Sequence, residues 1–171
     1  MDYLRTYVDR PGFLPSAALV IVVYVLLRAT RHSMWGIALL ALPGTVAHEL
    51  AHLVVGSVLR AEPRAFSIWP RRSNTGWTLG SVAFGKIGLL NGAFVTLAPL
   101  VLLPLAWLCL VHVLLPLWVE GRWGWWVGGG YLAATALFAA LPSFQDLRVG
   151  APSILIYVIL GGLLLLAYIY V

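Results

Sequence analysis

The sequence predicts an all-α polytopic membrane protein with about five transmembrane helices and a small membrane-associated β-hairpin between the second and the third. The first reason is composition, because 61% of the 171 residues are hydrophobic and only 10% are charged. A soluble domain of this length carries roughly a quarter charged residues. The second reason is that several apolar runs approach or exceed the roughly 18 to 20 residues that span a bilayer core. We therefore expect residues 1–171 to form a single integral membrane domain.

The apolar runs place the expected helices along the chain. We expect transmembrane helices over residues 13–27, 34–59, 88–119, 128–141 and 153–171. Pro43 lies inside the second run. Because proline removes a backbone donor, it predicts a kink or a restart there, with Thr45 near the new N-terminus. Residues 120–126 are polar and rich in tryptophan, which is typical of an interfacial turn.

The segment at residues 60–86 differs from the rest of the chain. Strand-favouring residues alternate over 65–69 and 77–84, on either side of the turn-like sequence Arg72-Ser73-Asn74-Thr75-Gly76. This pattern predicts a β-hairpin over 64–85 that lies at the membrane surface or dips into it.

The basic residues predict an orientation in the membrane. Of the 11 Lys and Arg, 8 lie in the N-terminal segment, the hairpin segment and the turn at 142–152, and 3 lie in the other connections. The positive-inside rule therefore predicts a cell-membrane protein whose N-terminus and hairpin are cytoplasmic. We interpret the net charge of +5 as contact with lipid headgroups, and we expect no nucleic acid partner.

The motif His-Glu-x-x-His occurs once, as His48-Glu49-Leu50-Ala51-His52. At about 100° per residue, the two histidines lie about 40° apart on one face of a helix. Two imidazoles in that arrangement can hold one zinc ion, and the Glu49 carboxylate can reach a water molecule bound to it. The motif predicts a zinc site with Glu49 as the general base.

The polar residues of this helix share one stripe, at i, i+3 and i+4 spacing. The stripe comprises Thr45, His48, Glu49, His52 and Gly56. The remaining surface is apolar, so we expect the stripe to face other helices and the apolar surface to face lipid. Buried ionisable groups cost at least a few kcal/mol each on insertion scales, so they usually mark a function. The alternative is a pair of histidines that hydrogen bonds satisfy within a helical core.

A catalytic zinc site normally has three protein ligands and one open position, so a third ligand is needed. His112 lies in an apolar helical run, His32 lies at a loop, and Glu120 lies in the turn on the opposite side. Asp146 is the best candidate, because it follows a short helix that ends at Pro142 on the side of the hairpin. The alternative for Asp146 is a solvated loop aspartate paired with Arg148.

Asn91 lies at an apolar helix start, where a free amide must find partners. It is expected either to cap or bridge helices or to bind the backbone of a substrate. Cys109 and His112 are assigned to packing.

The sequence resembles the site-2 protease-like group of intramembrane zinc metalloproteases, the M50-type peptidases. The resemblance rests on His48-Glu49-Leu50-Ala51-His52 in a membrane helix, followed by a hairpin segment with glycines, a helix with Asn91, and an aspartate at the edge of a later helix. It covers roughly residues 40–150. Many members carry an Asn-Pro…Leu-Asp-Gly signature, whereas this chain has Pro142-Ser143-Phe144-Gln145-Asp146 and no glycine after the aspartate.

The resemblance implies that His48, His52 and Asp146 bind the zinc, that Glu49 is the general base, and that the substrates are membrane-spanning proteins cut within or near the bilayer. Two other functions remain open. One is a non-catalytic metal-binding membrane protein, either a carrier or an assembly factor. The other is a membrane zincin of another group, with a glutamate such as Glu62 or Glu120 as the third ligand.

Overall fold

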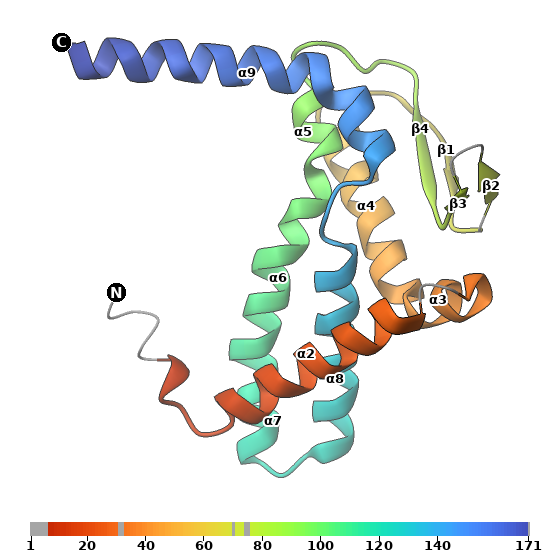
Figure 1. Ribbon diagram of the computed structural model, residues 1–171, viewed down its shortest axis with the longest axis vertical. Helices are drawn as coiled ribbons and strands as arrows, with labels where there is room; N and C mark the ends of the chain where they lie inside the picture. Colours follow the sequence, from red (N-terminus) through yellow and green to blue (C-terminus); the bar gives the residue numbers. More distant parts are fainter. Residues whose placement is uncertain (1–6, 31–32, 70, 74–75, 171) are drawn as a thin grey trace.

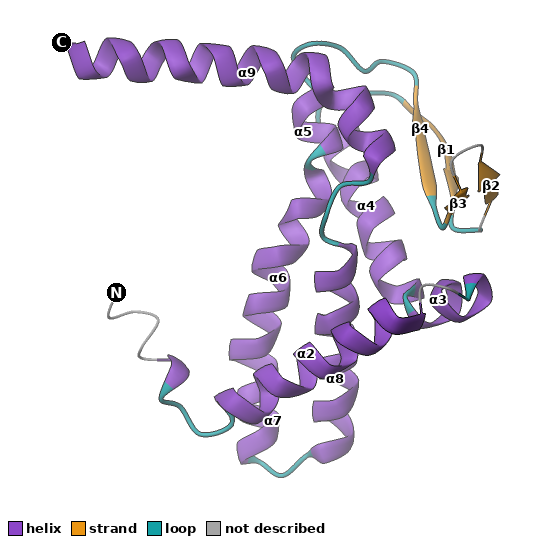
Figure 2. Cartoon of the chain, in the orientation of Figure 1, coloured by secondary structure: helices purple, strands orange, loops and turns teal. Residues whose placement is uncertain are grey.

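The computed structural model describes residues 7–30, 33–69, 71–73 and 76–170 (Figure 1). Most of these residues are helical (Figure 2). The elements in chain order are α2 (Phe13–Ala29), α3 (Met34–Leu40), α4 (Leu42–Val58), β1 (Pro63–Ser67), β2 (Arg71–Ser73), β3 (Gly76–Thr78), β4 (Ser81–Phe84), α5 (Gly92–Thr96), the 3₁₀ helix η2 (Ala98–Val101), α6 (Leu102–Cys109), the π-helical turn η3 (Leu110–Leu114), α7 (Leu115–Val119), α8 (Trp123–Ala139) and α9 (Phe144–Tyr170).

Among the described residues, two helices are long and apolar enough to cross a membrane. They are Ala98–Val119, with 22 residues, and Phe144–Tyr170, with 27 residues. The expected five transmembrane helices are not supported, because α2, α4 and α8 have 17 residues each. The third expected span also begins later than residue 88, since regular helix starts only at Gly92.

The apolar run at residues 34–59 is divided into two helices, which explains part of this difference. The break falls at Ala41, where α3 ends and α4 begins. Pro43 lies in the first turn of α4, where its missing N–H has no intrahelical partner to lose. The expected restart is therefore present, but it begins before Pro43 rather than after it.

The connection between α7 and α8 is shorter than the interfacial turn expected over 120–126. Helix α8 already begins at Trp123. A tryptophan cluster spans the connection, with the Trp118 ring centroid 4.8 Å from Trp123 and 5.0 Å from Trp126. Large amphipathic rings of this kind are typical of the membrane–water interface.

Asp146 lies in the first turn of α9, whereas a loop was expected there. The Ser143 Oγ accepts a hydrogen bond from the Asp146 N–H at 3.1 Å, and Asp146 Oδ2 accepts one from the Ser143 N–H at 2.7 Å. This reciprocal pair is a capping box, and it starts the helix at Phe144. The fifth span was expected to start at residue 153, because polar residues interrupt the apolar run before that point.

The hairpin segment forms two antiparallel strand pairs. Strands β1 and β4 pair in a register that sets Phe66 opposite Val82. Between them, β2 and β3 pair with Arg72 opposite Trp77. The expected antiparallel pairing is thus confirmed, and both β1 and β4 pack beside α4 (Figure 1).

The helices are joined by close contacts that leave little freedom between them. A Cβ on Gly44 would lie 2.1 Å from the Thr135 carbonyl oxygen, so α4 and α8 approach too closely there for any side chain. Helix α9 is tied to α5 by Ser153, whose Oγ accepts from the Ala93 N–H at 2.8 Å and donates to the Leu89 carbonyl at 2.7 Å. These contacts fix the positions of α4, α8, α5 and the start of α9, which together surround one site.

Candidate metal centre

The polar stripe of α4 faces the protein, as the sequence predicts. Glu49, His52 and Gly56 are buried. Leu50, Val54 and Val58, on the opposite face, are exposed. The helix is therefore inverted relative to a surface helix of a soluble protein, with ionisable groups inside and apolar groups outside.

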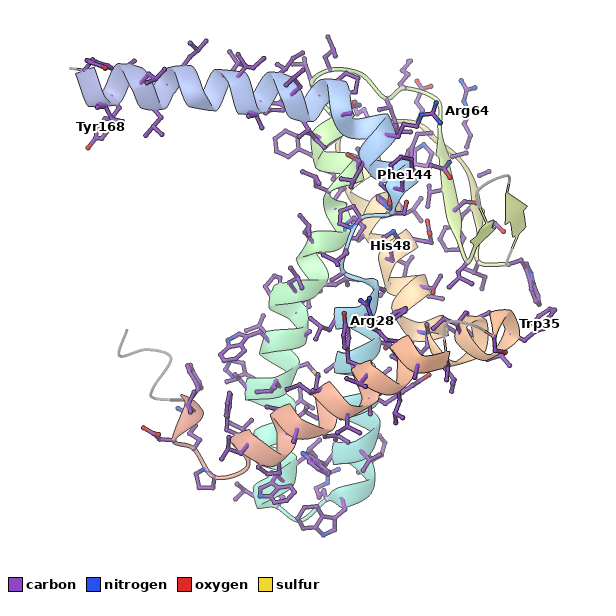
Figure 3. The ribbon with its side chains drawn as sticks, in the orientation of Figure 1. Arg28, Trp35, His48, Arg64, Phe144 and Tyr168 are labelled. Carbon is purple, nitrogen blue, oxygen red and sulfur yellow. The ribbon has the colours of Figure 1, made fainter. Side chains whose placement is uncertain are left out.

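Asp146 joins the two histidines of this stripe. The Nε2 atoms of His48 and His52 lie 3.2 Å apart. Asp146 Oδ2 lies 3.5 Å from His48 Nε2, and Asp146 Oδ1 lies 3.3 Å from His52 Nε2. In the view of Figure 3, His48 lies below Phe144, the residue that starts α9. Residues almost a hundred positions apart in the chain thus present nitrogen and oxygen atoms to one point.

These separations bring two nitrogens and a carboxylate close enough to bind one metal ion. Metal–nitrogen and metal–oxygen bonds to zinc are about 2.0–2.2 Å, so neighbouring ligand atoms of a tetrahedral site lie roughly 3.3 Å apart. The two Nε2 atoms lie 3.2 Å apart, and each of them lies 3.3 or 3.5 Å from a different oxygen of Asp146. The group of His48, His52 and Asp146 could therefore hold a metal ion.

Backbone carbonyls fix the orientation of both imidazole rings. His48 Nδ1 lies 2.7 Å from the Ala139 carbonyl oxygen, and His52 Nδ1 lies 2.7 Å from the Val95 carbonyl oxygen. A carbonyl only accepts, so each Nδ1 carries the hydrogen and each Nε2 of a neutral ring presents its lone pair to the centre. Histidine ligands of metals are usually held by an outer hydrogen bond of this kind.

Because of these ring orientations, the three candidate ligands present hydrogen-bond acceptors to one another. Two Nε2 lone pairs and a carboxylate meet within hydrogen-bonding distance of one another, in a partly buried position. Acceptors that face each other repel, and this repulsion is stronger where water is partly excluded. A cation, either a metal ion or a proton shared within the group, relieves it.

The first turn of α9 fixes the orientation of the Asp146 side chain. Its side chain is 20% exposed, and the Ser143 N–H holds Oδ2 on the side of His48. Among the described residues, the basic side chains within 4 Å of the Asp146 carboxylate are His48 and His52. The alternative of a solvated loop aspartate paired with Arg148 is therefore wrong.

Glu49 lies beside the three candidate ligands and is 6% exposed. Its carboxyl group lies against the backbone at Gly80, just before β4, where an added Cβ would meet Glu49 Oε1 at 2.8 Å. The neighbouring Leu79 packs on the apolar cluster of Leu27, Ile37 and Ala41. The turn before β4 is thus fixed to the helices on one side and covers Glu49 on the other.

Glu49 and the three candidate ligands all line one cavity of about 1230 Å³. Residues 79–85, including the whole of β4, form one wall, and the α8–α9 junction forms another. The side chains around the polar centre include the apolar Leu79, Val82, Phe84, Phe138, Leu141 and Phe144, together with polar ones such as Gln145 and Arg148. The cavity has room for a segment of extended polypeptide with apolar side chains.

The other ligands that were considered lie elsewhere. Glu62 forms an ion pair with Lys86, and Glu120 lies 3.5 Å from Arg122. His112 is exposed on η3, so its assignment to packing within this chain is wrong. Cys109 is partly buried against the core cluster of α2, η3 and α8, as expected. His32 lies outside the described residues.

Asn91 holds the loop that precedes α5. Its Oδ1 accepts from the Gly88 N–H at 2.8 Å, and its Nδ2 donates to the Lys86 carbonyl at 3.0 Å. Both polar atoms therefore have backbone partners within the loop that precedes α5, so the Asn91 side chain neither caps that helix nor bridges two helices. Binding of a substrate backbone by Asn91 stays a prediction.

Two contributors to the site were not predicted from the sequence. Ser143 directs Asp146, and its signal was present as Ser143-x-x-Asp146, a capping-box pattern with aspartate in place of glutamate. Gly80 contacts Glu49, and nothing in a single sequence distinguishes it from the other glycines of the hairpin.

Comparison with family models, curated proteins and solved structures finds no match to this chain. Functional inference therefore rests on the residues of the site.

Proposed function

We propose that the chain is a zinc-dependent intramembrane endopeptidase of the site-2 protease-like, M50 type. The observation that carries the proposal is the convergence of His48, His52 and Asp146 with Glu49 beside them in one cavity. Two histidine nitrogens and one carboxylate, with a further position open to the cavity, form the ligand set of many hydrolytic zinc sites.

The donor set suits zinc in particular. Two imidazoles and one carboxylate fit a borderline-soft ion with no preferred geometry of its own. Calcium and magnesium prefer six or more oxygen ligands, which this site does not offer among the described residues. Zinc bound there would supply a Lewis acid that polarises a water molecule and a peptide carbonyl.

The chain's own residues account for the proton transfers. Glu49 accepts a proton from the attacking water and returns it to the nitrogen of the departing amine. Glu49 follows His48 directly in the chain and lines the same cavity, so it could exchange a proton with a water molecule bound in that cavity. The two backbone-bound imidazoles and the capped Asp146 hold their positions during this exchange.

The cavity supports a peptide substrate from a membrane-spanning protein. Strand β4 pairs with β1, and its residues also line the cavity, so an unwound substrate segment could add to β4 by backbone hydrogen bonds. Such pairing would satisfy peptide groups that lipid cannot satisfy. The apolar lining suits side chains that come from a transmembrane segment.

The membrane location belongs to the same proposal. In the described ranges two helices are long and apolar enough to cross a bilayer, and α9 projects from the helical bundle with an apolar, exposed surface (Figure 1). A helix that is apolar around its whole circumference is stable in lipid. We place the protein in the cell membrane with its N-terminus and hairpin in the cytoplasm, as its basic residues predict.

The test compares the wild-type protein with Glu49→Gln. Both are purified in detergent micelles, loaded with zinc and incubated with a mixture of synthetic membrane-spanning peptides, and new peptide termini are detected by mass spectrometry. We expect cleavage by the wild type and a loss of at least about 100-fold in Glu49→Gln. The matched control is Glu120→Gln, at an exposed site that pairs with Arg122. Equal cleavage by Glu49→Gln and the wild type would exclude the proposed mechanism.

The non-catalytic alternative predicts a different result in the same experiment. A metal carrier or an assembly factor would bind zinc through the three ligands but would yield no new termini with any variant. A zincin with a glutamate ligand would lose zinc on substitution of Glu62 or Glu120 rather than of Asp146.

A further inference from the structure

We propose that Pro99 and Pro142 are positioning residues for the two metal-binding histidines, because each removes the amide hydrogen that would compete for the carbonyl that orients a ring. The inference rests on the proposed metal site. It concerns how the fold prepares that site before any ion binds.

The first case is His52. In an α-helix the carbonyl of residue i accepts from the N–H of residue i+4. For Val95 that residue is Pro99, which has no N–H. Helix α5 ends at Thr96 and continues as the 3₁₀ helix η2, in which Pro99 is fully buried. Pro99 therefore cannot supply the usual α-helical hydrogen bond to the Val95 carbonyl, and His52 Nδ1 lies 2.7 Å from that oxygen.

The second case is His48. Helix α8 ends at Ala139, and the residue three positions on is Pro142, which cannot donate to the Ala139 carbonyl. His48 Nδ1 lies 2.7 Å from that carbonyl. The residue four positions on is Ser143, and its N–H donates to Asp146 Oδ2 instead. The end of α8 before Pro142 thus leaves the Ala139 carbonyl as an acceptor for His48 and the Ser143 N–H as a donor for Asp146.

In both cases a proline removes an N–H that could have bonded to the carbonyl, four residues on for Val95 and three residues on for Ala139. A buried carbonyl without a helical partner carries a free-energy cost unless another donor is found. Here the donor is the Nδ1–H of a ligand. A restored amide at position 99 or 142 would offer the carbonyl a helical partner, and the ring would then be free to rotate or to carry its hydrogen on Nε2. A hydrogen on Nε2 blocks ligation by that nitrogen.

The substitutions Pro99→Val and Pro142→Val restore an N–H with a side chain of similar size. Pro104→Val is the control, since Pro104 is also helical but exposed, and the carbonyl four residues before it belongs to Leu100 rather than to a residue that contacts a histidine. Zinc affinity is measured by competition with a chelator. Loss of an outer hydrogen bond to a ligand typically weakens binding by about 10–100-fold, and we expect that loss for both test variants and less than about twofold for the control.

The second measurement is independent of zinc and of cleavage. In the metal-free wild type with ¹⁵N-labelled histidine, the nitrogen chemical shifts of His48 and His52 should report hydrogen on Nδ1 in both rings. In Pro99→Val the His52 signals should move toward the Nε2–H form while His48 keeps its own, and in Pro142→Val the reverse should hold.

Nε2–H rings in the wild type, or unchanged shifts and zinc affinity in folded variants, would overturn the inference. If a variant fails to fold, the wild-type spectrum still decides. Failure of the proposed function appears differently, as a wild type that shows Nδ1–H rings but cleaves nothing.

Discussion

The carboxyl group of Glu49 lies in contact with the backbone at Gly80, although the two residues belong to different elements and are separated by the whole of β1, β2 and β3. An added Cβ at Gly80 would lie 2.7 Å from Glu49 Cγ and 2.8 Å from Oε1. The turn before β4 therefore determines where the proposed general base can point.

Gly80→Ala should reduce turnover while leaving zinc in place. The added methyl group displaces the Glu49 carboxylate, and a misplacement of about 1 Å in a catalytic group can cost about 100-fold in rate. We expect a fall in kcat of about tenfold or more, with the zinc content of the wild type, in peptide cleavage by the purified protein. Gly124→Ala is the control, since a Cβ there would meet nothing within 4 Å. A variant with the wild-type kcat would show that Glu49 is free of this contact.

Asp146 and Ser143 should differ in their effect on zinc binding. Asp146→Ala removes a ligand, so we expect a loss of zinc affinity of at least about 100-fold. Ser143→Ala removes only the Oγ that accepts the Asp146 N–H, which should cost about 1 kcal/mol of stability and only a modest part of the affinity. Competition with a chelator measures both. Equal effects of the two substitutions would mean that Asp146 acts on the helix start and not on the metal.

Gly44→Val should destabilise the protein and loosen the site together. A Cβ at Gly44 meets backbone atoms of α8, at 2.1 Å from the Thr135 carbonyl oxygen, and backbone cannot rotate out of the way. The same pair of helices holds the contact of His48 with Ala139. We expect about 1–3 kcal/mol of lost stability and weaker zinc binding. Gly128→Val, at an open position of α8, should change neither in thermal unfolding and zinc titration.

Zinc should stabilise the folded protein, because it binds the assembled site and not the separated ligands. At a free zinc concentration 100 times its Kd, the gain is about 2.7 kcal/mol. The unfolding midpoint should therefore rise by several degrees on zinc addition and fall again with a chelator. His52→Ala should abolish this shift. A shift of equal size in His52→Ala would place the bound zinc elsewhere in the chain.

The core of the site could be predicted from the sequence because it depends on local geometry. The spacing of His48 and His52 fixes them on one face of any helix, and a stripe of ionisable residues in an apolar run must face inward. That face is buried in the structure, with Glu49 and His52 inside. Asp146 was predicted as the third ligand mainly from the resemblance to the site-2 protease-like group, together with its position after a short helix on the side of the hairpin.

The rest depends on contacts that a single sequence does not show. Polar residues at 143–148 interrupt the apolar pattern and predicted a loop, whereas a polar first turn capped by Ser143 starts α9. Five apolar runs predicted five spans, but the break at Ala41 shortens the second, and within the described part of the chain two helices are long and apolar enough to cross a bilayer. The contact of Gly80 with Glu49 arises only when the strand ribbon packs on α4.

The metal content of the purified protein tests the central claim most directly. Wild-type protein and the single variants His48→Ala, His52→Ala and Asp146→Ala are prepared in parallel and analysed by inductively coupled plasma mass spectrometry. We predict one zinc ion per wild-type chain and a large loss of zinc in each variant. A wild type without bound metal, or variants that all retain the full zinc content, would contradict a metal centre formed by these three residues.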